Sequence, residues 1–423
     1  MASFPAGPYE LLNELALAPS ASTAAFSQLL GAGPRVMDRE ESVKVANEFE
    51  TIRAFQQTTI DVFRAALCGE LPAYLADLLL NDAPPGFREE YHLSLGGAHW
   101  SLPLFFRTDE AKPGEIVEIQ APGSLWGEAE LVERYFTTIG ALPAQRPTLA
   151  RLFTDAALAC IGELPVAVMH MVDNASSPAA MRFFIAATRP RLKYFGYDPG
   201  IPSHACSLIR SHSFFGLMGQ NYTKLNLERC LEGSAIFDHP PHILFGQKAP
   251  LILPFLEETA GHFSDEIRAL LVTTTVLGAD GHVIAAEDAM SAQQFAELPR
   301  SRRQYFLKYA GCDVSRNWGS RAVYNLGNIS REQCLHRLKQ AADDTRRGGL
   351  WVLQPRVVAH ENVEFYNVEG SIQSRSMVAK FSVFHGPQGA LSATAQYRDF
   401  YKVHGQSDTV MTSVVDDATI ADG

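Results

Sequence analysis

The segment from Tyr305 to Pro355 constrains the fold of this 423-residue chain more than any other stretch. Its pattern predicts a strand that ends at Lys308, a loop that contains Gly319 and Ser320, a second strand, a helix, and a last strand that ends at Gln354. A lysine on a strand that faces a glycine-containing loop suits phosphate binding. Its ammonium attracts the phosphates, and backbone N–H groups of a loop without bulky side chains can cover them. The segment therefore predicts an α/β fold with a phosphate site.

The helix within this segment has a clear start. Ser330 followed by Gln333 forms the pattern of a capping box, in which each side chain binds the backbone N–H of the other residue. Cys334 and Leu338 lie behind it at helical spacing and are expected to face the core.

The patterns divide the chain into three regions. Residues 1–146 predict an N-terminal helical and mixed α/β region that could bind substrate, with one or two long amphipathic helices between Glu41 and Asn81. Residues 147–260 alternate in a βαβ manner, which predicts a small parallel sheet. Residues 261–423 contain the phosphate-binding pattern. A helix is also expected from Thr259 to Leu277.

Composition excludes several classes of function. The formal net charge is −11, so the chain has no overall positive charge for nucleic acid or an anionic membrane. The six cysteines form no CxxC pair. The G-x-x-x-x-G-K-[ST] loop and a G-x-G-x-x-G turn after a strand are missing. No secretion signal or membrane-spanning stretch is recognisable, and we expect a cytoplasmic protein without nucleic-acid or membrane partners.

The element order resembles the nucleotide-binding layout of the ATP-grasp superfamily. The stretches WGSRAV and WVLQP are most similar to its circularly permuted, glutathionylspermidine-synthase-like branch. The resemblance covers roughly residues 205–415 and is most specific from Lys308 to Gln354. It implies two α+β subdomains that sandwich ATP, preceded by a small parallel-sheet domain, with ATP and Mg²⁺ as cofactors.

The resemblance also implies roles for residues at the nucleotide. Lys308 would contact the α- and β-phosphates, Gly319 and Ser320 would lie in the mobile loop, and Gln354 with its neighbours would contact adenine. Lys248, in FGQKAPLILP, resembles the lysine at the entry to many ATP-grasp cores. A lysine that leads into a helix is also commonplace, so a structural role for it stays open.

Catalytic and metal-binding residues follow less directly. Arg375 and Lys380 lie on a predicted strand where the family often has a basic residue that contacts the γ-phosphate or the acyl phosphate. The alternative is that both are solvated charges on an edge strand. Arg210, in CSLIRSHSF, would line the cleft of the substrate residues Arg107, Asp109 and Glu118 from the central region. Asp408 and Glu364 are the candidate magnesium ligands. The closely spaced Glu and Asn that usually hold two magnesium ions after the hinge are missing.

A substrate site is expected near Arg107, Asp109 and Glu118. They resemble the R-x-D and strand-plus-Glu elements in the substrate half of permuted relatives. An arginine can grip a substrate carboxylate with two hydrogen bonds, and a carboxylate at a strand end can hold an amine. A structural salt bridge between Arg107 and Asp109 is the alternative.

Together these patterns predict an ATP-dependent ligase that joins a small-molecule carboxylate to an amine through an acyl phosphate. Phosphorylation of a different acceptor would use the same residues. A nucleotide-binding protein without turnover is a further alternative, as is an α/β protein whose lysine and glycines are structural. The helices between residues 41 and 81 leave a homodimer open.

Overall fold

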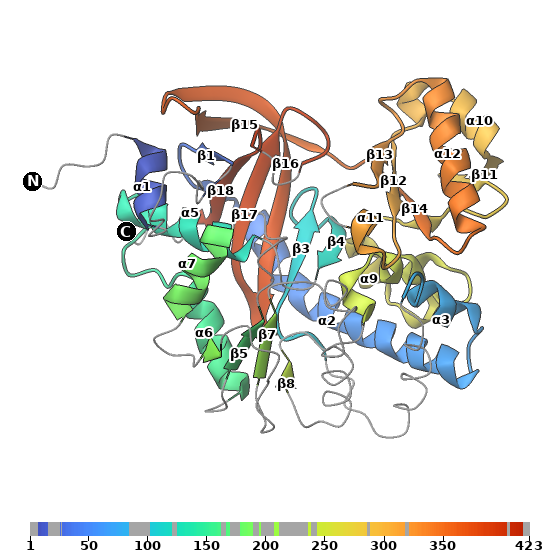
Figure 1. Ribbon diagram of the computed structural model, residues 1–423, viewed down its shortest axis with the longest axis horizontal. Helices are drawn as coiled ribbons and strands as arrows, with labels where there is room; N and C mark the ends of the chain where they lie inside the picture. Colours follow the sequence, from blue (N-terminus) through green and yellow to red (C-terminus); the bar gives the residue numbers. More distant parts are fainter. Residues whose placement is uncertain are drawn as a thin grey trace, which may run out of the picture.

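The protein, seen in a computed structural model, is a mixed α/β fold in which a large sheet flanked by helices adjoins a smaller lobe (Figure 1). The described residues are 7–15, 26, 28–83, 102–120, 125–161, 166–169, 178–188, 194–195, 207–210, 236–237, 243–285, 288–317, 321–403 and 407–417. No helix in this part of the chain has both the length and the apolar composition that a membrane span needs.

The large sheet takes its strands from both ends of the sequence. Its order is β15-β1-β18-β17-β16-β3-β4, and β2 pairs with β18. The long strand β16 pairs antiparallel with β15, β17 and β3. The predicted division of the chain into three regions, with boundaries at residues 146 and 260, stays a prediction. Strands of the first and third regions pair within this one sheet. The strands are β1 (Leu29–Gly31), β2 (Arg35–Met37), β3 (Phe106–Glu110), β4 (Ile116–Gln120), β15 (Ala359–Tyr366), β16 (Ile372–Gly386), β17 (Gly389–Arg398) and β18 (Val410–Asp416).

Two helices account for the apolar steps predicted between residues 41 and 81. α2 (Arg39–Cys68) begins after Asp38, whose side chain accepts a hydrogen bond from the first turn, and ends at Gly69 in the left-handed conformation. α3 (Tyr74–Leu79) follows after a short turn. The predicted helical pattern is confirmed. α2 runs from behind the large sheet toward α3 and packs against α9 (Figure 1).

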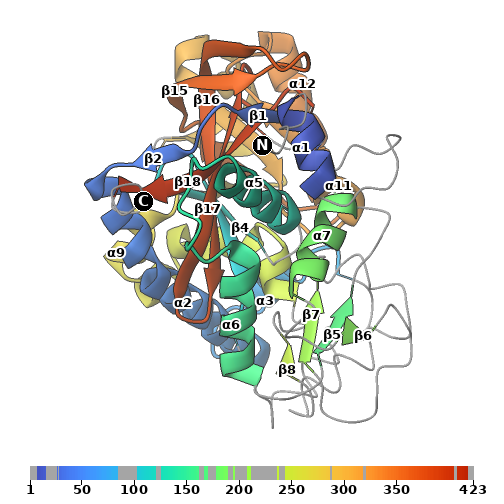
Figure 2. The same ribbon diagram turned by 90° about the vertical axis from the view of Figure 1, so that its left-hand side faces the viewer.

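Helices cover both faces of the large sheet. Because side chains alternate along a strand, Phe381 and Val383 of β16 point to one face and Phe384 to the other. The first face packs against Val45 of α2, and on the second face Trp126 of α5 lies with its ring centroid 5.0 Å from that of Phe384. Figure 2 shows α5 and α2 on opposite sides. The helices of the second face are α1 (Pro8–Leu15), α5 (Trp126–Thr138), α6 (Leu149–Ile161) and α7 (Pro178–Thr188).

The smaller lobe is an antiparallel sheet of order β13-β12-β14-β9 with its own apolar core. The capping box predicted at Ser330 and Gln333 is confirmed at the start of α12, and Cys334 and Leu338 are fully buried behind it. The elements are β9 (Thr275–Val276), β10 (His282–Ala285), β11 (Asp288–Ser291), α10 (Ala292–Glu297), η5 (Arg300–Arg302), β12 (Tyr305–Tyr309), α11 (Val314–Asn317), β13 (Val323–Asn325), α12 (Arg331–Thr345) and β14 (Trp351–Pro355).

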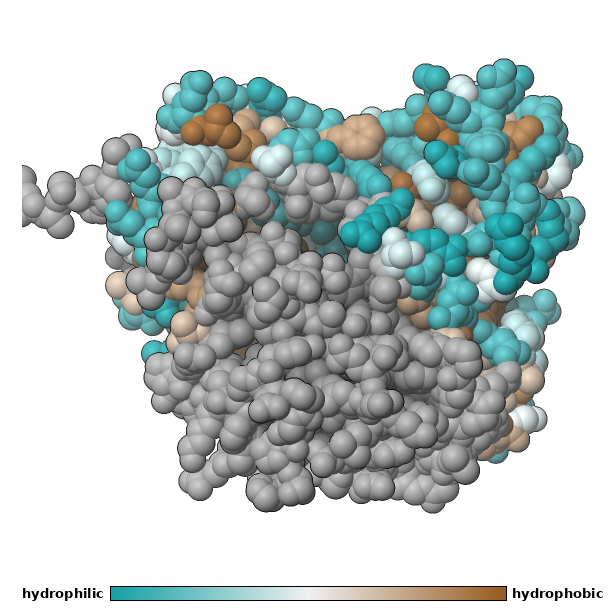
Figure 3. Space-filling view, viewed as in Figure 1, coloured by the Kyte–Doolittle hydropathy of each residue, from teal (hydrophilic) through white to brown (hydrophobic). Residues whose placement is uncertain are grey.

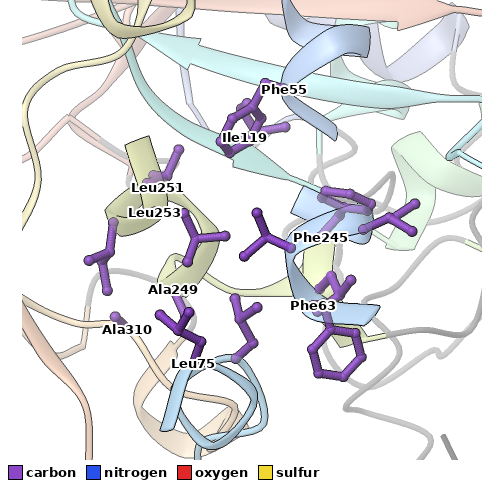
Figure 4. Close-up of a cluster of buried hydrophobic side chains, with 14 of the residues drawn as sticks. Phe55, Phe63, Leu75, Ile119, Phe245, Ala249, Leu251, Leu253 and Ala310 are labelled. Atoms are coloured by element: carbon purple, nitrogen blue, oxygen red, sulfur yellow. The ribbon is translucent and has the colours of Figure 1, made fainter. Parts of the chain in front are cut away.

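A further apolar cluster joins the large sheet to the smaller lobe (Figure 4). It brings Phe63 of α2, Ile119 of β4, Leu253 of η3 and Ala310 after β12 into one core. Continuous packing of this kind limits movement of the two parts where they meet. The connecting elements are η2 (Ile243–Gly246), η3 (Ala249–Phe255), η4 (Ala260–His262) and α9 (Asp265–Leu270).

The parallel sheet expected within residues 147–260 is present. Its order is β6-β5-β7-β8, and all three of its strand pairings are parallel. The strands are β5 (Val166–Met169), β6 (Tyr194–Phe195), β7 (Ser207–Arg210) and β8 (Ile236–Phe237).

The helix expected from Thr259 to Leu277 is wrong over most of its length. Only α9 is α-helical, and the chain then enters β9. The five consecutive β-branched residues from Val272 to Val276 explain the difference. Such side chains lose rotamer freedom in a helix and pack well on a pleated sheet.

Candidate functional site

Charged side chains gather where the large sheet meets the smaller lobe. β3, β4 and β16 contribute from the large sheet, β12 from the smaller lobe, and the residue before η3 completes the group. In the described part of the chain, this group places four cations beside two carboxylates. We call it the cationic site; its members are Arg107, Lys248, Lys308, Lys380, Asp109 and Glu118.

Strand periodicity and register place these residues together. Arg107 and Asp109 are two positions apart on β3, so they share one face. Asp109 lies opposite Glu118 of β4 and opposite Ser382 of β16, which is two positions from Lys380. Residues directly opposite in an antiparallel pair point to the same side of the sheet. The face that carries Phe384 toward α5 therefore also carries the cationic site.

Asp109 is held by three donors. Its carboxylate accepts from Arg107 Nε at 2.9 Å, from Lys380 Nζ at 3.0 Å and from Ser382 Oγ at 2.9 Å. Burial alone would raise the pKa of Asp109, but the two cations outweigh burial and hold this pKa well below its usual range. The carboxylate is therefore ionised and fixes both cations at the floor of the site.

Lys308 is buried and is positioned by Gln354. Its Nζ donates to Gln354 Oε1 at 2.5 Å, and Gln354 Nε2 donates to Thr274 Oγ1 at 2.8 Å. Burial and the nearby Lys248 and Lys380 lower the pKa of Lys308 to about 8, although carboxylates in the site oppose this. The Gln354 amide is engaged inside the protein, so the expected contact with adenine would fall to its neighbours.

Two further contacts complete the site. Lys248 Nζ lies 2.9 Å from Glu118 Oε1, which links the start of η3 to β4. Arg107 Nη2 donates to Gln120 Oε1 at 2.7 Å. Arg107 and Asp109 thus form a buried ion pair, as the alternative of a structural salt bridge predicts. The same pair also forms part of a cluster with excess positive charge.

The structure does not bring all predicted residues to this site. Arg375 lies on the other half of β16, is 52% exposed, and pairs with Asp399 at 3.0 Å. This exposed position agrees with the alternative of solvated charge, and a catalytic role for Arg375 stays a prediction. Its distance along the strand from Lys380 explains why the two residues do not share an environment.

The two predicted magnesium ligands are also elsewhere. Asp408 is 61% exposed and pairs with Arg398 at 2.8 Å. Glu364 is an exposed residue of β15. Across the described residues, no group of three or more His, Cys, Asp or Glu side chains is arranged to hold a metal ion. The sequence pattern does not reveal this surface position; neither carboxylate belongs to the cationic site, and their role as magnesium ligands stays a prediction.

Three predicted residues cannot be placed in the site. Gly319 and Ser320 lie outside the described residues, and Arg210 is described only by its backbone at the end of β7.

Sequence reasoning missed Gln120, Ser382 and Thr274, which hold the charged groups in position. Gln120 lies two residues after Glu118, and Ser382 two after Lys380. Strand periodicity could have identified both, because it places them on the same face as their charged neighbours. Thr274 had no such signal, since it was expected in a helix.

Comparisons with known proteins show similarity at the level of the fold. No family model and no curated protein matches the sequence. The structure is similar to a glutathione synthetase-like effector from Globodera pallida, with a TM-score of 0.52 and 12% identity over 96% of each chain. It is also similar to a protein provisionally named gamma-glutamylcysteine synthetase from Methylobacillus flagellatus, with a TM-score of 0.39 and 11% identity over 78% of this chain and 82% of that one. The first likeness shows a shared fold, and the second is too weak to support an argument.

Proposed function

We propose that this chain is an ATP-dependent ligase of the ATP-grasp type, which joins a small-molecule or peptide-like carboxylate to an amine. The cationic site carries the proposal: four cations beside two carboxylates in a chain of net charge −11. A polyanion such as a triphosphate, together with a substrate carboxylate, is the ligand that such a cluster attracts. The shared fold with a glutathione synthetase-like effector agrees with the proposal.

The lysines would divide the charge of the nucleotide between them. Lys308, on the smaller lobe, would contact the α- and β-phosphates, and Lys380, on the large sheet, would face the γ-phosphoryl group. A carboxylate oxygen of the substrate attacks the γ-phosphorus and ADP leaves; the amine then attacks the acyl carbon and phosphate leaves. The protein contributes fixed positive charge in a buried environment, where electrostatic stabilisation of developing negative charge is strong.

Magnesium would enter with the nucleotide. Mg²⁺ prefers oxygen ligands and commonly uses one or two carboxylates together with substrate phosphates. Asp109 is engaged by Arg107, Lys380 and Ser382. Glu118 is 23% exposed and is the carboxylate of the site with access to solvent. It is therefore the side chain that would hold the ion, which would neutralise phosphate charge.

Thermal unfolding with and without Mg-ATP tests the proposal. We expect Mg-ATP at about 100 times its Kd to stabilise the wild type by roughly 2.7 kcal/mol. Lys308→Met, which keeps the length of the side chain but not its charge, should lose this stabilisation. Lys339→Ala, on the exposed side of α12, is the matched control and should keep it.

The acceptor then separates the alternatives. Phosphate release that requires both a carboxylate and an amine supports the ligase. ADP release without an amine would favour phosphotransfer to another acceptor. Stabilisation by Mg-ATP without release of phosphate or ADP for any acceptor tested would indicate a nucleotide-binding protein without turnover. No stabilisation of a well-folded wild type at millimolar Mg-ATP would refute the nucleotide site itself.

A further inference from the structure

His360 lies on the face of the large sheet that carries the cationic site, at a rim that is exposed to solvent. It is the second residue of β15 and lies opposite Val378 of β16. Val378 and Lys380 are two positions apart on β16, so their side chains point to the same face. Residues directly opposite in an antiparallel pair also share a face. His360 and Lys380 are therefore diagonal neighbours, with about 7–8 Å between their Cα atoms.

Lys380 lies between two strands that share one edge of β16. β17 pairs with this stretch of β16 and occupies the other edge. β15 pairs with β16 as far as Ala379, and β3 pairs with it from Phe381 onward. Asp109 of β3 is therefore the diagonal neighbour of Lys380 on one side, and His360 of β15 is its diagonal neighbour on the other. A group bound at Lys380 would lie between Asp109 and His360.

Solvent reaches this rim of the site. His360 is exposed, and its imidazole has no hydrogen-bond or ion-pair partner among the described residues. Residues 356–358 carry the chain from β14 of the smaller lobe to β15, so His360 lies where the two parts of the molecule meet. Figure 3 shows a notch in the upper outline of the molecule, between the large sheet and the smaller lobe. A substrate can therefore approach Lys380 from solvent past His360.

The carboxylates of the cationic site are poor proton acceptors. Arg107 and Lys380 hold the pKa of Asp109 well below its usual range. Glu118 pairs with Lys248 at 2.9 Å. An amine is mostly protonated at neutral pH, and it must lose a proton before its nitrogen can attack an acyl carbon. Histidine is the side chain whose neutral ring ordinarily accepts a proton in this pH range.

Neighbouring carboxylates do not compete for this proton. Glu361, next in sequence, points to the opposite face and accepts from an arginine of β2. Arg398 lies on the same face across Val378 and pairs with Asp408 at 2.8 Å. Glu364 shares the face but lies four residues farther along β15, away from the cationic site. The imidazole is therefore the acceptor closest to the cationic site on this rim.

We propose that His360 is the general base that accepts a proton from the amine substrate. This inference rests on the proposed function, which places the acyl phosphate at Lys380. The ammonium group of the substrate first gives one proton to the imidazole. The nitrogen lone pair then bonds to the acyl carbon, while the bond from that carbon to the phosphate oxygen breaks and its electron pair leaves with the phosphate. A second N–H proton goes to the leaving phosphate, and the exposed imidazole releases its own proton to solvent.

The first test places His360 relative to the nucleotide and needs no carboxylate or amine. In the proton NMR spectrum, the C2–H resonance of His360 is assigned by its loss in His360→Gln. Only ATP carries the γ-phosphate that would lie beside Lys380, so Mg-ATP should shift this resonance more than Mg-ADP does. The resonance of His336, on the exposed side of α12, should not move. Equal effects of the two nucleotides, in a protein that Mg-ATP stabilises against heat, would overturn the inference.

The second test compares two small amines that differ in basicity. At neutral pH methylamine is almost wholly protonated, whereas hydroxylamine is mostly unprotonated. With the carboxylate that the acceptor screen identifies, His360→Gln should lower kcat/KM for methylamine about 100-fold and change it little for hydroxylamine. Added imidazole should restore part of the rate with methylamine in His360→Ala, because the exposed position leaves room for it. His336→Ala is the matched control and should behave as the wild type with both amines.

The outcomes separate this inference from the proposed function. Equal losses with both amines, no rescue by imidazole, or no use of methylamine by a wild type that uses hydroxylamine would show that His360 does not act as a base. Absence of stabilisation by Mg-ATP would instead refute the nucleotide site. Stabilisation without phosphate release for every carboxylate tested would refute the ligase activity on which the inference rests.

Discussion

Behind the cationic site, on the opposite face of β3, a second buried cluster makes stability depend on pH. It consists of Glu48 from α2, Thr108 and Glu110 from β3, and His385 from β16. Glu48 is 3% exposed, and Glu110 and His385 are 0% exposed. His385 Nε2 lies 3.4 Å from Glu48 Oε1 and 3.2 Å from Thr108 Oγ1, which donates to Glu110 Oε1 at 2.7 Å.

The three titratable groups of this cluster favour their neutral forms. Burial raises the pKa of Glu48 from 4.5 to about 8, although a hydrogen bond with Glu110 opposes the shift. Burial, together with repulsion from Glu48, raises the pKa of Glu110 to about 8. Burial lowers the pKa of His385 to about 4, although Glu110 opposes it. The folded state therefore keeps protons on the carboxyl groups that the unfolded chain releases near pH 4.5.

The sign of the effect follows from these shifts. A carboxyl group whose pKa is raised by folding contributes stability that declines as pH rises from 4.5 to about 8. His385 has a lowered pKa, so its contribution declines as pH falls below 6.5. Between pH 6.5 and 8 only the two carboxyl groups of the cluster act, and each lowers the free energy of unfolding by about 1.4 kcal/mol per pH unit. The decline over this window is on the order of 2 kcal/mol for each group.

Glu48→Gln tests this account, because an amide has nearly the shape of a protonated carboxyl group but does not ionise. Urea unfolding at steps from pH 6.5 to 8 should show the variant gaining on the order of 2 kcal/mol relative to the wild type. Glu50→Gln, at an exposed position of the same helix, should show a constant difference from the wild type. A constant difference for Glu48→Gln as well would refute the reasoning.

Two further predictions concern the smaller lobe and a residue outside the site. Leu338→Ala, at a fully buried position of α12, should lower the free energy of unfolding by about 2–5 kcal/mol in the same urea assay; a change below about 1 kcal/mol would contradict the packing of this core. Arg375→Ala should change stability by less than about 1 kcal/mol, because its ion pair with Asp399 is half exposed, and it should leave the Mg-ATP melting shift intact. Loss of that shift would return Arg375 to the nucleotide site.

Local signals in the sequence predicted the elements that depend on local interactions. The capping box at Ser330 and Gln333 marks the start of α12, because both of its hydrogen bonds lie within one turn. The strand predicted to end at Lys308 corresponds to β12, which ends one residue later at Tyr309. The helix predicted from Thr259 to Leu277 is wrong over most of its length. The prediction relied on apolar residues at helical spacing and gave too little weight to the β-branched run from Val272 to Val276.

Long-range pairing was beyond the reach of these signals. Asp109 and Lys380 are 271 residues apart in the chain, and nothing local to either indicates that β3 pairs with β16. Sequence reasoning accordingly assigned Arg107, Lys248 and Lys380 to separate roles. In the structure they belong to one electrostatic cluster. The exposure of Asp408 was equally hidden, because burial depends on the tertiary structure.

The alternation of β3 connects the two clusters. Arg107 and Asp109 point to the cationic site, whereas Thr108 and Glu110 point to the buried cluster under α2. Ionisation of Glu110 near pH 8 would place a negative charge on the other face of β3, directly behind the cationic site. This charge would weaken the attraction of the cationic site for a polyanion. Lys308 loses its proton in the same range, so affinity for a nucleotide falls above pH 8 for two reasons. Glu110→Gln separates them: the part of the fall that persists in this variant belongs to Lys308, and the part that disappears belongs to ionisation of Glu110.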